Sequence, residues 1–352
     1  MEIPIIILNW NGLKDTEACL DALLRQTIQN FKIYLVDNGS ADESPEKLKK
    51  NYGANPKINL ILNQENLGFT GGNNEVLLKY ILPNPAYEYV VLLNNDTVPT
   101  ESWLEHLVQS AKTNQAAVVS SKMIDFFEPE KMDNAGHMML NTGEVLPIGH
   151  GEPVGKYTEG FENMGACAGA ALYSVDMLKD IGIFDEHFNT GYEDAELGVR
   201  AVITGYKCWY EPTAIVYHKM GQSIKKIFNY EYSLTIQKHI WYTFFKLMPL
   251  RVILITVPFL LFKYIALFTI NILFNRPKYL KILFQALKES LWDEFDITLQ
   301  ARKLFYNKKQ IFLFPLLRKQ KFFLWVDIIR FYKYFILNRH SALDVYGKVE
   351  KI

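Results

Sequence analysis

The chain has 352 residues, 49% hydrophobic and 22% charged, a length that suits one large catalytic domain with an appendage. Its net charge of zero hides a division: residues 1–218 carry 15 Lys and Arg against 30 Asp and Glu, whereas residues 219–352 carry 23 against 8. Three scattered cysteines exclude a disulfide framework and a cysteine-rich metal site, and they favour a reducing compartment. The acidic start, Met1-Glu2, lacks the features of a signal peptide, so we expect a cytosolic catalytic part.

Apolar runs alternate with helical patterns along the first third of the chain. Unbroken apolar runs of this kind are typical of strands that are covered on both faces. The alternation predicts an α/β fold with a Rossmann-like, mostly parallel sheet flanked by helices. The predicted strands are 3–8, 31–36, 58–63, 89–93 and 116–121, and the predicted helices are 14–26, 43–51, 73–82 and 103–113.

Regularity is lost in the next stretch, residues 123–164, which is rich in Gly, Asn, Pro and His. We expect a loop-rich insertion or small antiparallel hairpins there, shaping an acceptor site. Helical patterns at 176–181 and 195–204 and a strand-like run at 208–217 follow. We therefore predict a catalytic domain over residues 1–225, with a nucleotide-sugar half to about 122 and an acceptor half from about 123. Residues 226–352 form the predicted basic, hydrophobic helical tail.

Polar side chains gather where the predicted strands end, which is where ligands bind in parallel sheets. Asp37 can accept a hydrogen bond from the N3–H of a pyrimidine base, although taken alone an Asx turn is the favoured explanation. The glycine-rich stretch 66–74 would let the backbone approach a phosphate, although many ordinary loops share this composition. Its spacing matches neither a P-loop nor a dinucleotide-binding fingerprint.

Two acidic clusters about a hundred residues apart carry the strongest chemical signal. Asp96 follows an apolar run and two asparagines, and a carboxylate there suits Mg²⁺ or Mn²⁺ shared with a diphosphate. The alternative is a solvated acid at a strand end. Glu193 and Asp194 precede a helix, where acids either interact with the helix dipole or act as a general base. His218 ends another strand, and a structural role and metal ligation remain equal alternatives for it.

Together these segments resemble the inverting nucleotide-sugar glycosyltransferases of family 2, and within them the bacterial rhamnosyltransferase-like branch that builds surface polysaccharide. The resemblance covers residues 3 to about 225, and seven segments in the same order carry it: 7–12, 36–42, 66–73, 92–97, 182–186, 192–194 and 216–218. It implies a GT-A fold. It also implies transfer of a sugar, with rhamnose as the best guess, from a nucleotide-diphosphate donor to a hydroxyl of a lipid-linked or surface polysaccharide acceptor.

The resemblance also assigns roles to individual residues. Asp194 would be the general base, with Glu193 in support, and Asp96 and His218 would hold a divalent cation. Asn94 replaces the first acid of the family's Asp-x-Asp element, so we expect a cation without strict dependence on it. Two other functions remain open: a nucleotidyltransferase, and a catalytically inactive carbohydrate-binding scaffold. The implied donor-binding residues are Asn9, Asp37, Asn66, Gly68, Phe69, Asn73 and Asn95.

The tail contains an apolar run, 252–274, that is long enough to cross a bilayer but contains Lys263 near its middle. Sixteen Lys and Arg lie beyond Phe274, and positive segments resist translocation. We therefore expect helices lying in the membrane interface, or a re-entrant hairpin, at the cytoplasmic face of the cell membrane. Long aliphatic runs favour a membrane surface over nucleic acid as the partner. The alternative is a helical appendage packed on the catalytic domain.

Overall fold

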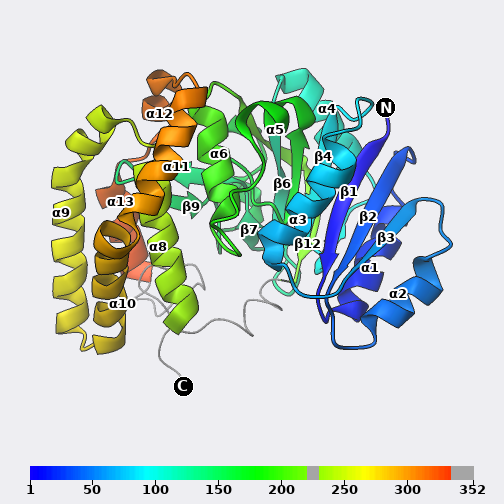
Figure 1. Ribbon diagram of the computed structural model, residues 1–352, viewed down its shortest axis with the longest axis horizontal. Helices are drawn as coiled ribbons and strands as arrows, with labels where there is room; N and C mark the ends of the chain where they lie inside the picture. Colours follow the sequence, from blue (N-terminus) through cyan, green and yellow to red (C-terminus); the bar gives the residue numbers. More distant parts are fainter. Residues whose placement is uncertain (220–229, 334–352) are drawn as a thin grey trace. The chain divides into compact units, whose positions relative to one another are not determined.

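The computed structural model describes residues 1–219 and 230–333, which belong to two compact units (Figure 1). The N-terminal unit comprises residues 1–137 and 147–219 of the described chain. The C-terminal unit comprises residues 230–333 together with Met138–Leu146, a segment taken from the middle of the first unit's sequence. The predicted domain boundary at 225 and the end of the tail, 334–352, lie outside the described residues.

A single large sheet forms the centre of the N-terminal unit. Its main path runs β10-β12-β6-β11-β4-β1-β2-β3, with β5 paired to β12 and β7 paired to β6. β1 pairs in parallel with β2 and β4, as do β2 with β3 and β6 with β12. The strands are β1 (Ile3–Asn9), β2 (Phe31–Asn38), β3 (Ile58–Asn63), β4 (Tyr89–Leu93), β5 (Thr97–Pro99), β6 (Val118–Asp125), β7 (Met132–Asn134), β10 (Phe161–Glu162), β11 (Ala170–Ser174) and β12 (Cys208–His218).

The predicted α/β fold is confirmed, with one qualification. β11 lies antiparallel between β4 and β6, so the sheet is mixed rather than uniformly parallel at its centre. β11 comes from the small, apolar segment that follows the irregular insertion. Four of its five side chains, from Ala170 to Tyr173, are buried, as is typical of a central strand.

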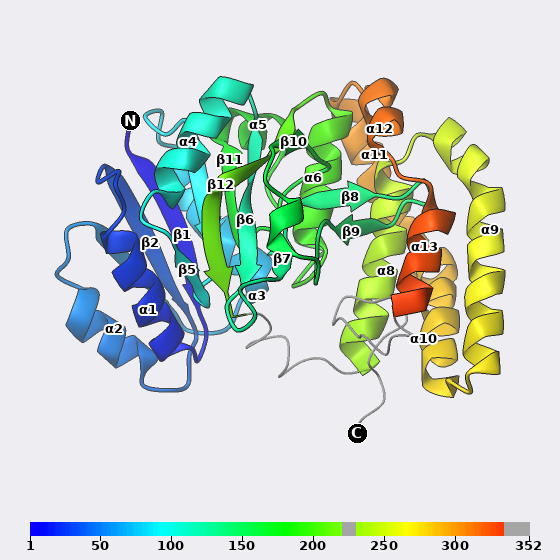
Figure 2. The ribbon, with the colours of Figure 1, turned by 180° about the vertical axis from the view of Figure 1, so that it is seen from behind.

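Helices cover both faces of this sheet. Figure 1 shows α3 in front of the sheet, and Figure 2 shows α1 and α4 in front of its other face. α1 buries Cys19, Leu20 and Leu23 at helical spacing, and these side chains join the core formed by β1 and β2. The helices are α1 (Leu13–Leu24), α2 (Ser44–Tyr52), α3 (Gly68–Val76), α4 (Trp103–Asn114), α5 (Val175–Ile181) and α6 (Glu193–Ile203), with a π-helical turn at Leu77–Ile81 and a 3-10 turn at Val154–Lys156.

The start of α3 differs from the sequence-based expectation. We expected a loop up to residue 72 and a helix from Asn73, but the helix begins at Gly68 and contains the glycines. A Cβ atom added to Gly72 would lie 3.1 Å from the side chain of Leu8 on β1. The glycines therefore allow this helix to pack closely against the sheet.

The C-terminal unit combines a hairpin with a set of helices. Its hydrophobic core joins α8, α9 and α10 through Leu234, Leu267, Ile282 and Leu283. A second cluster packs Leu140 and Leu146 of the hairpin against Phe323. The elements are β8 (His137–Met139), β9 (Val145–Pro147), α8 (Tyr230–Leu247), α9 (Leu250–Leu273), α10 (Pro277–Lys288), a π-helical turn at Glu289–Asp293, α11 (Phe295–Lys308), α12 (Leu313–Lys319) and α13 (Phe323–Phe331).

Candidate active site

Asn9 and Asp37 end the neighbouring parallel strands β1 and β2 and are paired in register. The Asn9 amide Nδ2 donates to Asp37 Oδ2 at 2.7 Å, and both side chains are buried. The other carboxylate oxygen, Oδ1, accepts from the Ser40 backbone N–H at 3.0 Å. The Asx turn therefore accounts for one oxygen of Asp37, and its predicted contact with a nucleobase remains a prediction.

Asn95 joins this pair from the end of β4. Its Nδ2 donates to Thr16 Oγ1 at 2.9 Å, and Thr16 Oγ1 in turn donates to Asn9 Oδ1 at 2.8 Å. The Gly12 backbone N–H also donates to Asn9 Oδ1, at 3.2 Å. Three of the predicted donor-binding residues, Asn9, Asp37 and Asn95, thus belong to one hydrogen-bonded group at one edge of the sheet.

Asn66 and Gly68 lie beside the same edge. Asn66 is exposed, and its Oδ1 accepts from Asn38 Nδ2 at 3.0 Å and from the Gly68 N–H at 2.8 Å. Gly68 has a φ of +71°, and a Cβ atom there would collide with the side chain of Asn189. Only glycine fits this combination of a left-handed backbone and a close neighbour.

Phe69 and Asn73, the other two predicted donor-binding residues of this segment, make structural contacts within the protein. The Phe69 ring contacts Phe184 edge to face, with the ring centroids 6.1 Å apart. Asn73 is buried, and its Nδ2 donates to the Phe69 carbonyl one helical turn earlier, at 2.9 Å. Asn73 therefore stabilises the first turns of α3, and a contact between it and a donor would require this hydrogen bond to change.

Asp96 and His218 are brought together, and a third residue, Asp133, joins them. His218 Nε2 lies 3.2 Å from Asp96 Oδ1, and His218 Nδ1 lies 2.7 Å from Asp133 Oδ2. His150 Nδ1 is 3.4 Å from the other oxygen of Asp133. Burial lowers the pKa of His218, but its hydrogen bonds to the two carboxylates outweigh burial and raise the pKa to about 10.

This arrangement fits a divalent cation with two protein ligands. A cation bound to both Asp96 and His218 Nε2 would take the place of the proton that links them. Asp133 on Nδ1 then matches the carboxylate that commonly orients a metal-binding histidine. Within residues 1–219 and 230–333, no three His, Cys, Asp or Glu side chains converge as a ready metal site. Diphosphate oxygens would have to supply the remaining ligands.

Asp194 and Glu193 begin α6 but occupy different surroundings. The Asp194 side chain is partly exposed, and its oxygens accept from the backbone N–H groups of Ala168 at 3.0 Å and Ala195 at 2.7 Å. Glu193 is buried, and among the described residues its Oε2 has no hydrogen-bond partner. Burial, with the charge of Asp194 as a second cause, raises the pKa of Glu193 to about 8. Asp194 is therefore the partly exposed member of the pair, and Glu193 is the buried one.

His137 lies beside Asp194, which the sequence did not indicate. Its Nε2 is 4.0 Å from Asp194 Oδ2, at the point where the hairpin segment leaves the N-terminal unit. Burial lowers the pKa of His137, and the Asp194 charge only partly opposes this. His137 is thus a neutral neighbour of the predicted base near neutral pH.

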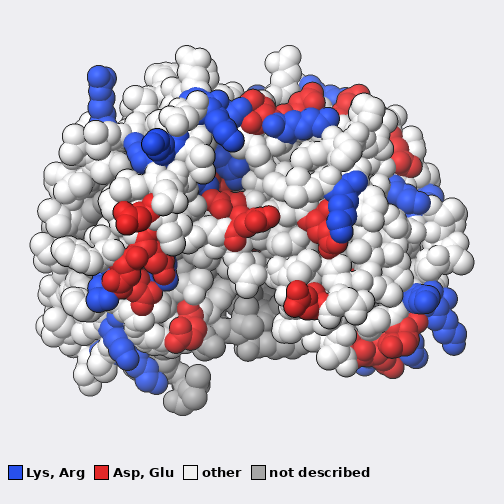
Figure 3. Space-filling view, in the orientation of Figure 1, with Lys and Arg blue, Asp and Glu red and all other residues white. Residues whose placement is uncertain are grey.

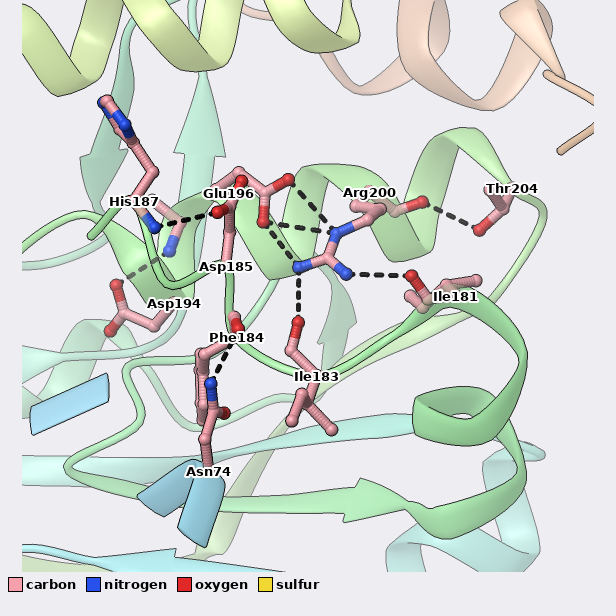
Figure 4. A network of polar contacts seen from close by, with 11 residues as sticks. Asn74, Ile181, Ile183, Phe184, Asp185, His187, Asp194, Glu196, Arg200 and Thr204 are labelled. Atoms are coloured by element: carbon pink, nitrogen blue, oxygen red, sulfur yellow. Dashed lines mark hydrogen bonds and ion pairs between the residues drawn. The ribbon is translucent and has the colours of Figure 1, made fainter. Parts of the chain in front are cut away.

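A buried ion pair holds α6 in place (Figure 4). Glu196 and Arg200 are one turn apart on the helix, with Oε2 and Nη2 separated by 2.6 Å. Arg200 also donates to the carbonyls of Ile181 and Ile183, each at 2.8 Å. Glu196 thus neutralises a buried arginine, and it also lies in the first turn of α6, where the helix dipole favours an acid. Arg200 ties α6 to the segment that precedes the predicted base.

The two acidic clusters meet around one short segment, residues 167–169. The Ala168 N–H donates to Asp194, while the neighbouring Gly169 carbonyl accepts from the Asn94 N–H at 2.8 Å. Burial raises the pKa of the Cys167 thiol, and the charges of Asp194 and Asp133 contribute as well. The segment that precedes Asp96 and the helix start that carries Asp194 are therefore both hydrogen-bonded to residues 168 and 169.

Comparisons with known proteins identify the family to which the chain is similar. The model of the family described as "Glycosyl transferase family 2" matches residues 5–182. The bifunctional glycosyltransferase pgtA of Dictyostelium discoideum is 25% identical over 126 residues, which cover 36% of this chain and 16% of that protein. An uncharacterized glycosyltransferase of Haemophilus influenzae is 21% identical over 256 residues, covering 67% of this chain and 71% of that protein.

One solved structure matches most of the chain. It is the mannosyltransferase PcManGT from Pyrobaculum calidifontis in complex with GDP-Man and Mn²⁺. The TM-score is 0.53 at 17% identity, and the match covers 83% of this chain and 87% of that one. The similarity is one of fold, and it confirms the predicted GT-A architecture.

Proposed function

Because the chain belongs to glycosyltransferase family 2, we propose that it transfers a sugar from a nucleotide-diphosphate donor to a hydroxyl group of an acceptor. One observation carries the proposal. Asp194 accepts from the Ala168 N–H, the adjacent Gly169 carbonyl accepts from the N–H of Asn94, and Asp96, two residues after Asn94, pairs with His218. A transferase needs both chemistries at once, because one group must stabilise the departing diphosphate while another activates the incoming hydroxyl.

The mechanism that we propose is a single displacement with inversion at the anomeric carbon. Asp194 accepts the proton of the acceptor hydroxyl as the oxygen attacks the face opposite the nucleotide. The Ala168 N–H, bonded to Asp194 Oδ2, holds the carboxylate in a fixed orientation. A cation held by Asp96 and His218 would neutralise the charge that develops on the leaving diphosphate. The group formed by Asn9, Asp37 and Asn95 would bind the nucleoside.

The resemblance to the rhamnosyltransferase-like branch supports finer proposals about the substrates. We propose rhamnose as the sugar and a lipid-linked or surface polysaccharide as the acceptor. An enzyme acting on such an acceptor needs access to a membrane, so we also propose that it works at the cytoplasmic face of the cell membrane.

A panel of nucleotide sugars tests the donor proposal. The thermal unfolding midpoint is measured with each donor, with and without Mn²⁺, because a ligand at 100 times its Kd stabilises the folded state by about 2.7 kcal/mol. We expect one donor to raise the midpoint and Mn²⁺ to increase the shift. Asp96→Asn should lose the Mn²⁺-dependent part, whereas Glu46→Gln, an exposed change on α2, should keep it. A panel in which no donor shifts the midpoint and none is turned over would contradict the proposal.

A further inference from the structure

Helix α9 has the reverse of the usual amphipathic arrangement. In a soluble protein the apolar stripe of a helix faces the core and polar residues face water. The buried stripe of α9 instead contains the polar side chains Thr256, Lys263 and Asn271, and most of the exposed positions are apolar, Arg251 and Thr269 being the exceptions. The buried residues are Val252, Thr256, Lys263, Leu267 and Asn271, and the exposed ones include Leu250, Leu254, Ile255, Leu261, Phe262, Ile265, Ile272 and Leu273.

The lysine in this stripe belongs to a buried ion cluster within the C-terminal unit. Lys263 Nζ contacts Glu144, and it lies 3.1 Å from Asp327 Oδ2. Arg330 Nη1 lies 3.2 Å from Glu144 and 3.2 Å from Asp327. Burial alone would raise the pKa of the Glu144 carboxyl, but the charges of Lys263 and Arg330 hold this pKa well below its usual range. Two cations and two anions thus balance one another beneath α9.

The partners of α9 argue against a helix that crosses the bilayer. Glu144 lies in the hairpin segment, and the Asn141 carbonyl accepts from Thr256 Oγ1 at 3.2 Å. Asp327 and Arg330 lie on α13, which has nine residues, whereas a crossing takes about 20. Among the described helices, α9 alone is long and apolar enough to span. A crossing would carry a two-stranded hairpin and a short helix to the depth of the hydrocarbon, where open sheet edges do not occur.

The exposed face of α9 continues onto α13. One groove is lined by Phe262, Ala266 and Ile270 of α9 and by Leu324 and Ile328 of α13. Trp325, next to this groove, is 72% exposed. Figure 3 shows few charged side chains on the flank formed by α9. These side chains form one apolar surface, which we call the α9–α13 face.

Basic residues accompany this face. Residues 219–352 carry 23 Lys and Arg against 8 Asp and Glu. Exposed cations occur on both sides of α9 and near α13, at Arg251, Lys278, Lys281 and Lys321. An apolar face with aromatic and basic residues at its borders is complementary to an anionic lipid surface.

We propose that the C-terminal unit is a monotopic membrane anchor. Helix α9 lies in the plane of the membrane, with the α9–α13 face in the lipid and the Lys263 stripe enclosed by protein. The surrounding lysines and arginines contact anionic headgroups. This inference goes beyond the proposed transfer reaction and stands without it, because none of the residues that carry it belongs to the candidate active site.

Vesicle flotation tests the docking surface. The full chain is mixed with phosphatidylcholine vesicles, or with vesicles that also contain phosphatidylglycerol, at low and high salt. We expect binding to both, stronger and salt-sensitive on the anionic vesicles. The double variant Leu254→Glu/Ile265→Glu should bind about tenfold or more weakly, because each change places a charge in the lipid. The matched control, Leu62→Glu/Leu78→Glu, changes two exposed residues of the N-terminal unit and should bind like the parent. A parent chain that stays free of both vesicle types, or a double variant that binds as well as the parent, overturns the proposal.

Cysteine labelling tests the orientation of α9. Arg251→Cys places a thiol in the first turn of α9, and Lys278→Cys places one just beyond its end, at the start of α10; both positions are exposed. Each variant is treated with a membrane-impermeant maleimide in inverted and in right-side-out membrane vesicles, with the parent chain as background. In-plane binding predicts that both thiols are labelled from the cytoplasmic side alone. Labelling of the two positions from opposite sides would show a crossing and overturn the proposal.

Discussion

Replacing Asp194 by Asn tests the assignment of the base most directly, and the adjacent Glu193→Gln is its matched control. Both variants turn a carboxylate into an amide of the same shape. Asp194 is partly exposed and held by two backbone N–H groups. Glu193 is buried, and its Oε2 has no hydrogen-bond partner among the described residues. The two residues therefore differ in surroundings far more than in sequence position.

The expected magnitudes follow from this difference. Loss of a general base costs about 10²–10⁴-fold in rate, equivalent to about 2.7–5.4 kcal/mol in the barrier. We expect a loss in this range for Asp194→Asn, with donor binding retained. Burial and the Asp194 charge raise the pKa of Glu193 to about 8, so this side chain already carries a proton at neutral pH. An amide resembles the protonated acid, and we expect Glu193→Gln to lose less than about tenfold.

The pH dependence provides a second measurement. As the pH rises from 4.5, the ordinary pKa of a glutamate side chain, to about 8, folded Glu193 keeps its proton while the unfolded chain loses it. The folded state then binds more protons than the unfolded state, so stability falls through this window. Glu193→Gln removes this contribution, and its unfolding midpoint should fall less than the parent's over that range. Turnover of sugar donor, followed by nucleotide release, gives kcat/KM for both variants across the same range.

Two results would refute this reasoning. If Asp194→Asn stays within about tenfold of the parent, Asp194 is not the base. If Glu193→Gln falls as far as Asp194→Asn and loses its activity at every pH, the base role belongs to Glu193.

Three further predictions concern the surroundings of the site and the tail. Asp133→Asn should weaken Mn²⁺ binding in the presence of nucleoside diphosphate by about 10–100-fold, measured from the free Mn²⁺ signal in electron paramagnetic resonance. An unchanged affinity would show that Asp133 does not support cation binding. Arg200→Met should lower the free energy of unfolding by about 3–5 kcal/mol in urea titrations, because it removes the cation that is paired with the buried Glu196 carboxylate, and a loss near zero would contradict the pairing. Lys263→Met should speed amide hydrogen exchange in α13, since Glu144 and Asp327 would share a single cation; unaltered exchange would show that the cluster does not hold this helix.

The positions of several predicted donor-binding residues could be inferred because they follow strands that the sequence marks clearly. Apolar runs stop at Asn9 and Asp37, and the parallel pairing of β1 with β2 places these two opposite each other. The same reasoning located Asp96 and His218. Their pairing in the structure depends on β5 and β12 lying side by side, where Thr97 pairs with His218.

Asp133 and His137 could not be found in the same way. Both come from the irregular insertion, on strands of three residues, and such short strands carry no periodic signal. Their positions depend on pairing with distant segments, as β7 does with β6. The α3 start was missed for a related reason: glycines favour loops in isolation, and the close contact of Gly72 with Leu8 is a tertiary effect.

In the tail, the sequence predicted helices and a membrane-seeking run but not the partner of its central lysine. Lys263 binds Glu144, which lies 119 residues earlier in the chain. Treating Lys263 as an isolated charge therefore overstates the free-energy cost of burying its ammonium group. The carboxylates that compensate it come from segments with no local sequence relation to α9.

Because the hairpin segment Met138–Leu146 lies within the sequence of the N-terminal unit, no single cut in the coding sequence separates the two units. A fragment that stops at residue 219 would retain Leu140 and Leu146 without Phe323, and Glu144 without either of its counter-ions. Grafting a foreign tail onto this chain would therefore require three junctions, one before the tail and one at each end of the nine-residue hairpin segment that must be exchanged with it. Among divergent homologues, we expect substitutions in the hairpin segment to co-vary with substitutions in the tail rather than with those in the flanking sequence.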